Sequence, residues 1–235
     1  MRSAAVLLLV ALTASCATLR RPPDPRGLDA DTPAAAWTEL AEIRAAFPGA
    51  RAFLTIDPER GRRFDATLAV DGEGRIALEG LSPLGTTLFG IYGEGERLLF
   101  VNERERTWWE GTFEQFAART GLFRGIHVSR AADLGLILLG IPPEEAILQD
   151  AWATAASGIR YRVERTGLAE VLTPGNAARV LYLPAAYPPV RVRLVSAGST
   201  LEIYHHEIVS GATEVTIAQP DASWTCCVLP RIVDR

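Results

Sequence analysis

The sequence predicts a mainly β fold of the α+β class, in which one curved antiparallel sheet forms an incomplete β-barrel with helices packed on its concave side. Apolar and polar residues alternate along much of the chain, and Gly or Pro stands in most connections. The expected helices are grouped at the start and in the middle and do not alternate with strands, which excludes a doubly wound parallel sheet. About ten or eleven strands are expected, and a sheet of that size curls.

The first elements are a helix and a hairpin. Thr32-Pro33 followed by the apolar side of 34–47 predicts a helix, because proline is favoured in the first helical turn. From Ala50 the apolar period changes from helical to alternating. In the run 64–70 every second residue is apolar, which predicts a strand, and the turn at 71–74 returns the chain as a strand over 75–81.

The stretch 78–92, "LEGLSPLGTTLFGIY", predicts two strands joined by a turn. Ser82, Pro83 and Gly85 suit positions i, i+1 and i+3 of a type I turn. Leu84 then stands at the tip, where a polar or small residue is usual. Either Leu84 packs under a neighbouring helix, or it is exposed for a purpose.

The middle of the chain predicts two short strands and then helices. After strands at 97–102 and 107–110, Thr112 and Gln115 form the pattern of a capping box for a helix. A second, almost wholly apolar helix is expected from Ser129 until Gly140 ends it, and Pro142-Pro143 is expected to open a further helix. The remaining strands are expected at 159–165, 168–173, 178–183, 189–195, 200–208 and 213–218.

The N-terminus resembles that of a bacterial lipoprotein. An apolar run at 4–12 is too short to span a bilayer, and small residues lead directly to Cys16, as in a lipobox. The resemblance implies a signal peptide at 1–15, a lipidated Cys16 with a tether at 16–31, and one domain at 32–235. The alternative is an ordinary signal peptide followed by an incidental cysteine. Ala17, which is not aspartate, favours the outer membrane, with the domain facing the periplasm.

Composition excludes several function classes. The 235 residues carry a net charge of −4 and contain no lysine, which argues against nucleic acid binding and removes Schiff-base, Ser-Lys and P-loop chemistry. No Gly-x-Ser-x-Gly elbow is present, and the adjacent His205 and His206 would point to opposite faces of a strand. Cys226 and Cys227 are either two thiols or a vicinal disulfide. We expect no enzyme, no cofactor and no metal site.

Several motifs together resemble LolB, the outer-membrane lipoprotein that receives lipoproteins from the periplasmic carrier LolA and inserts them into the membrane. They are the Pro83-Leu84-Gly85 turn between two strands, the "TFEQFAARTGL" helix at 112–122, the Leu139-Gly140-Ile141-Pro142 helix ending and the hairpin at 187–208. The resemblance covers most of 34–208. The segment from about 210 to 235 extends beyond it.

The resemblance implies a fold that binds acyl chains and acts with a LolA-like carrier. It makes Pro83, Leu84 and Gly85 the membrane-insertion loop, in which Leu84 enters the bilayer and contributes about 1.5–3 kcal/mol. The candidates for the cavity or its lid are Leu78, Leu88, Phe89, Leu134, Ile137 and Leu138. The alternative is a non-catalytic envelope-assembly lipoprotein that uses the same fold to bind a protein partner by strand addition at a sheet edge.

Overall fold

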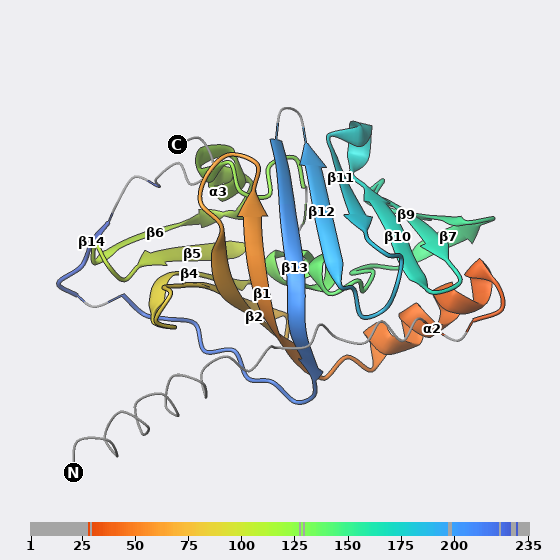
Figure 1. The fold of residues 1–235 in the computed structure, drawn as a ribbon, viewed down its shortest axis with the longest axis horizontal. Coiled ribbons are helices and arrows are strands. Elements are labelled where there is room, and N and C mark those ends of the chain that lie inside the picture. Colours follow the sequence, from red (N-terminus) through yellow and green to blue (C-terminus); the bar gives the residue numbers. More distant parts are fainter. Residues whose placement is uncertain are drawn as a thin grey trace, which may run out of the picture.

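The computed structural model describes residues 28, 30–126, 128, 130–196, 199–220, 222–226 and 229. Figure 1 shows a large, strongly twisted sheet with helices against it and at one edge. Fourteen strands of the described residues form this sheet, in the order β14-β6-β5-β4-β3-β2-β1-β13-β12-β11-β10-β9-β8-β7. Because β14 and β7 stand at opposite ends of the order and do not pair, the sheet is not closed.

Every neighbouring pair of strands is antiparallel except β14 and β6, which are parallel. The first half of the sheet contains β1 (Gly49–Pro58), β2 (Phe64–Asp71), β3 (Arg75–Leu81), β4 (Thr87–Glu94), β5 (Arg97–Asn102), β6 (Thr107–Thr112) and β14 (Thr225–Cys226). The second half contains β7 (Ala146–Gln149), β8 (Trp152–Ala155), β9 (Arg160–Glu164), β10 (Gly167–Leu172), β11 (Ala178–Tyr182), β12 (Arg191–Ser196) and β13 (Ser199–Ser210). The two halves join where β1 pairs with β13.

Three α-helices and the short 3-10 helix η1 (Pro174–Asn176) lie in the described chain. α2 (Pro33–Ala45) begins at Thr32, whose side chain accepts a hydrogen bond from the amide of Ala35. α3 (Phe113–Thr120) has the expected capping box between Thr112 and Gln115. α4 (Ala131–Leu138) ends as predicted at Gly140, which has φ +76, and the amide of Ile141 donates to the Leu136 carbonyl in the manner of a Schellman motif.

One face of the sheet, here the helix face, packs against α3 and α4. α4 contacts β2, β3 and β4, and a side chain at Gly93 or Gly135 would collide with atoms across this interface. Alternate residues of β1, β2 and β3, such as Leu54, Leu68 and Leu78, are buried here. The opposite face is called the outer face below. At the other end of the sheet α2 contacts β9 and β10, and Trp37 lies 5.8 Å from the Tyr161 ring.

Two predicted elements are wrong. The helix expected after Pro142-Pro143 is instead the β7–β8 hairpin, because a turn with Asp150 at φ +56 brings Gln149 opposite Trp152. The apolar residues of this short run fit the spacing of a helix as well as that of a strand, so the sequence did not distinguish the two. The strand expected at 213–218 is irregular, since it pairs with no strand. The second helix begins at Ala131, two residues later than expected.

The segment that follows β13 crosses the outer face. Figure 1 shows it leaving the lower end of β13 and reaching β14 beside β6. We call residues 211–220 and 222–224 the C-terminal strap. Asp71 holds it, because one Asp71 carboxylate oxygen accepts from the Val215 amide at 3.3 Å and from Arg75 Nε at 2.7 Å. Burial would raise the pKa of Asp71, but hydrogen bonds from the Arg75 backbone amide, the Arg75 side chain and the Val215 amide lower it on balance.

Candidate functional site

The turn between β3 and β4 has the geometry that its sequence predicts. The Gly85 amide donates to the Ser82 carbonyl at 2.8 Å, and the Ser82 amide donates to the Thr86 carbonyl at 2.8 Å. Gly85 has φ +79, as the left-handed third residue of such a hairpin loop requires. The Ser82 hydroxyl also accepts from the amides of Leu84 and Thr86, each at 3.2 Å. The turn is therefore held by several local hydrogen bonds.

Leu84 is 92% exposed at the tip of this turn. The possibility that it packs under a helix does not hold, and Pro83 and Gly85 beside it are exposed too. An exposed leucine on a well-bonded turn loses little conformational entropy when it enters an apolar phase. The arrangement thus presents one large apolar side chain to the surroundings at no cost to the core.

Aromatic rings hold the base of the hairpin. Phe89 lies across Gly80, where a Cβ atom would stand only 2.3 Å from the ring. The centroid of Phe89 is 5.5 Å from that of Phe64 and 6.0 Å from that of Phe100, and Phe100 in turn contacts Phe116 of α3. These contacts tie the turn to the core and to α3.

The predicted cavity and lid residues lie mostly inside the packed core. Leu78, Leu134, Ile137 and Leu138 are at most 3% exposed, whereas Leu88 and Phe89 are half-buried. None of these six lines either cavity described next. α4 covers the helix face of β2 to β4, and its Leu134, Ile137 and Leu138 are packed in the core and not open to a cavity.

A cavity of about 360 Å³ lies beside the two middle helices, next to the β8–β9 turn. Its walls are mixed: beside six apolar residues they carry Glu114, the ion pair of Arg130 with Asp133 at 2.8 Å, and Glu144, which accepts hydrogen bonds from Ser157 and Tyr161. Burial, together with Glu144, raises the pKa of Tyr161. The apolar lining residues are Phe113, Ile126, Val128, Pro143, Ile159 and Pro174.

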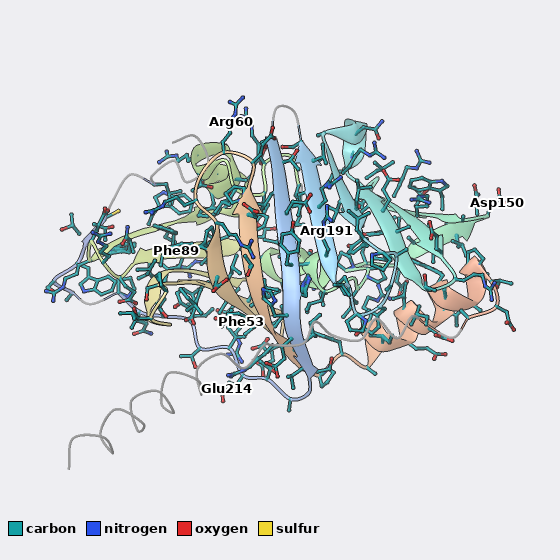
Figure 2. All side chains as sticks on the ribbon, in the orientation of Figure 1. Phe53, Arg60, Phe89, Asp150, Arg191 and Glu214 are labelled. Atoms are coloured by element: carbon teal, nitrogen blue, oxygen red, sulfur yellow. The ribbon has the colours of Figure 1, made fainter. Side chains whose placement is uncertain are left out.

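A larger cavity, of about 970 Å³, lies on the outer face over β1 to β3 and is called the outer-face groove. Ser82, Pro83 and Gly85 of the turn lie along its border, and so do residues 214–216 of the C-terminal strap. Figure 2 shows Phe53 and Glu214, which both line it, in the same region of the sheet. The sequence did not reveal this groove, because the strap that borders it was predicted as a strand.

Hydrogen bonds fix the acidic side chains on the groove floor. The Thr55 hydroxyl donates to Asp65 at 2.7 Å and also bonds His206 Nε2 at 2.7 Å. The Tyr92 hydroxyl donates to Glu79 at 2.8 Å, and burial followed by this bond raises the pKa of Tyr92. Both carboxylates are thereby held in place at the surface of the sheet.

The histidine and tryptophan pairs lie on opposite faces, as alternation predicts. His206 is on the outer face, whereas His205 is 1% exposed on the helix face and neither of its ring nitrogens has a hydrogen-bond partner among the described residues. Trp109 is buried against Phe116, and Trp108 lines a second hollow under the strap with Trp224. "ERER" at 103–106 forms the exposed β5–β6 turn.

Some predictions fall on residues that the structure does not describe: Cys16, Ser129, His127 and Cys227 lie outside the described ranges. Cys226 is an exposed free cysteine. Within the described ranges, no three His, Cys, Asp or Glu side chains gather as metal ligands, and no helix is long and apolar enough to cross a bilayer.

Comparison with known proteins gives distant structural likenesses only. No family model and no curated protein matches the chain. A LolA superfamily protein from Nitrosomonas europaea is similar at 10% identity and a TM-score of 0.47, covering 79% of this chain and 96% of that one. A DUF1329 family protein from Desulfovibrio piger is similar at 9% identity and a TM-score of 0.48, covering 79% and 95%. An uncharacterized conserved protein from Thermus thermophilus has 11% identity, a TM-score of 0.40, and covers 81% and 98%.

Proposed function

We propose that this protein is a non-catalytic lipoprotein of the outer membrane that binds acyl chains and helps to insert lipoproteins into that membrane. The observation that carries the proposal is Leu84, 92% exposed at the tip of a hairpin turn. Single exposed apolar residues are common on protein surfaces. Here, however, the exposed residue is the leucine of the Pro-Leu-Gly pattern on which the resemblance to LolB rests. Cys16 supplies the lipid anchor in this proposal, and a LolA-like carrier supplies the cargo.

The acyl-chain site in this proposal lies under the two middle helices, on the face that we take to be the concave side of the sheet. The 360 Å³ cavity beside them has six apolar residues among its eleven lining residues and falls in the size range of small-ligand sites. In this proposal Leu134, Ile137 and Leu138 of α4, the helix that also supplies Asp133 to the cavity wall, line a deeper cavity once α4 moves outward. Acyl chains are apolar, so a bound chain would replace contacts between packed apolar side chains with apolar contacts of the same kind.

The test is complementation in a bacterial strain depleted of its own LolB. We expect the unchanged protein to restore delivery of lipoproteins to the outer membrane and Leu84→Glu to fail, because a charged tip does not enter the bilayer. The matched control is Ile147→Glu, since Ile147 is 74% exposed on β7 at the far end of the sheet. Neither change should alter the free energy of unfolding by more than about 0.5 kcal/mol. Equal activity of Leu84→Glu, or no delivery by any version, would refute the proposal.

A second candidate function is partner binding by strand addition, and β7 favours it. β7 ends the sheet, so one side of its backbone pairs with no strand of the described residues, and its Ile147 is exposed. On this candidate a stoichiometric partner would co-purify with the unchanged protein and with Leu84→Glu but be lost with Ile147→Glu. The same two variants therefore separate the two functions.

A further inference from the structure

The outer-face groove carries an excess of negative charge. Four carboxylates line it, from Asp65, Glu79, Glu207 and Glu214, against the single cation of Arg51. Arg51 itself donates to the Glu214 backbone carbonyl at 3.5 Å. Among the described residues no arginine forms an ion pair with any of these four acids, although Arg75, Arg97, Arg162, Arg179, Arg191 and Arg193 all pair with acids elsewhere. The groove is therefore suited to a cationic occupant.

The groove also offers apolar contacts to an extended chain. Phe53 and Tyr92 lie on its floor with Ala69, Ala77 and Leu81. Aromatic grooves accept proline-rich segments, because a polyproline II chain loses little entropy on binding. An occupant that combines proline with positive charge would satisfy both properties of the surface.

The sequence of this chain contains such a segment just before its first described residue. Arg20-Arg21-Pro22-Pro23 combines two adjacent arginines with two prolines. Leu28 marks where this segment joins the fold, because the Leu28 amide donates to the Thr166 carbonyl in the β9–β10 turn. That turn and the start of β1 lie at the same end of the sheet. Gly167 begins β10, and because the strands from β10 to β13 are antiparallel, β13 ends at the level where β10 begins. Ser210, at this end of β13, pairs with Ala50 of β1.

The length of chain matches the distance to the groove. β10 and β1 are separated by four strand spacings in the sheet order, which is about 19 Å at about 4.8 Å each, and β2 adds a fifth. A polyproline II chain rises about 3.1 Å per residue, so the seven or eight residues from Leu28 back to Arg21 and Arg20 extend about 22–25 Å. The two arginines thus reach β1 and β2, two of the three strands that form the groove floor.

We infer that the segment Arg20–Pro23 binds in the outer-face groove, with the two guanidinium groups against its carboxylates and the prolines on Phe53. Ser82, Pro83 and Gly85 border the same groove. Cys16, four residues before Arg20, would then emerge near the turn that carries Leu84. The lipid anchor and Leu84 would then contact the same patch of membrane. This last statement rests on the proposed function.

The test is photo-cross-linking in the full-length, lipidated protein in detergent micelles, with p-benzoylphenylalanine at Thr18, beside the arginines. We expect an intramolecular cross-link to peptides of β1 to β3 or to residues 207–216, identified by mass spectrometry. Arg20→Glu with Arg21→Glu should reduce its yield at least about fivefold. Adding Glu207→Arg with Glu214→Arg to that variant should restore it, because the charge pattern is reversed on both sides. The matched control is Arg26→Glu, which lies too close to Leu28 to reach the groove and should leave the yield unchanged.

Cross-links to another part of the surface, or to a second copy of the chain, would overturn the inference, and so would a yield that does not respond to the paired charge reversal. Complementation by Leu84→Glu is a separate readout. If the cross-link maps to the groove while Leu84→Glu remains active, the proposed function fails and the binding of the tether stands. If Leu84→Glu is inactive while the cross-link maps elsewhere, only the tether inference fails.

Discussion

His205 is the residue whose chemistry fits its surroundings least. It is 1% exposed on the helix face of β13, and its ring has no hydrogen-bond partner among the described residues. Burial, with a smaller effect of the neighbouring His206, lowers its pKa to about 4, and the nearby backbone of Leu138 and Val190 offsets this only in part. A neutral imidazole is therefore kept where an apolar side chain would be at least as stable.

The first prediction concerns acid stability. The folded pKa of His205 lies below its unfolded value of about 6.5, so the unfolded chain binds the extra proton and stability falls as the pH drops from 6.5 towards 4. At pH 4.5 the loss from this one group is about 2–3 kcal/mol relative to pH 7.5. His205→Leu should remove that loss, as measured by urea unfolding at the two pH values.

His206→Gln is the control for this experiment. His206 lies on the outer face and makes only the smaller contribution to the lowered pKa of His205, so the variant keeps the buried ring and should keep most of the acid sensitivity of the unchanged protein. An identical dependence on pH in His205→Leu and the unchanged protein would show that other groups cause the acid sensitivity.

At the scale of elements, the β3–β4 hairpin requires Gly80, which lies in β3 and outside the turn. Gly80→Ala would place a Cβ atom 2.3 Å from the Phe89 ring, which Phe64 and Phe100 hold in place. We expect a loss of about 1–3 kcal/mol in the free energy of unfolding, the usual cost of overpacking. In Gly211→Ala, where nothing lies within 4 Å, urea unfolding should show a change below about 0.5 kcal/mol. Equal stabilities of the two variants would mean that Phe89 rotates away freely.

Local chemistry decided which elements could be predicted from the sequence. The capping box at Thr112 and Gln115, the helix end at Gly140 and the turn at Ser82–Gly85 each follow from hydrogen bonds between residues at most five apart, and all three were predicted. The β7–β8 hairpin was missed because four-residue strands are too short for their period to differ from that of a helix. β8 continues the pairing to β9, whose residues are only six to ten positions further along the chain.

The features of the candidate site also differ in whether the local sequence or only the fold reveals them. The exposure of Leu84 was one of two alternatives that the turn pattern left open, and the packing of Leu134, Ile137 and Leu138 on α4 could only be known from the fold. The outer-face groove was not predictable at all. It requires the strap to return across β1 to β3, and the Asp71 carboxylate that holds Val215 lies 144 residues away in the chain.

At the scale of the whole molecule, α4 joins the two halves of the sheet. It contacts β2, β3 and β4 of the first half, and on the second half the Tyr182 hydroxyl of β11 donates to the Ile137 carbonyl at 2.7 Å. Tyr182 is 2% exposed, and burial raises its pKa, so the hydroxyl stays protonated and donates at any ordinary pH. One buried hydrogen bond therefore links the second half to the helix that covers the first.

Removing that bond tests the coupling. In Tyr182→Phe the Ile137 carbonyl still accepts from the Gly140 amide, so we expect a loss of only about 1 kcal/mol in the free energy of unfolding. Amide hydrogen exchange should accelerate in α4 more than in β1 or β13, because the helix loses its attachment to β11 while the sheet keeps its pairing. Tyr204→Phe on the outer face keeps the ring beside Arg63 and Arg191 and should change neither quantity. Uniform acceleration across sheet and helix would instead show that α4 opens only with the whole fold, which would also remove the route by which we propose that acyl chains reach Leu134 and Leu138.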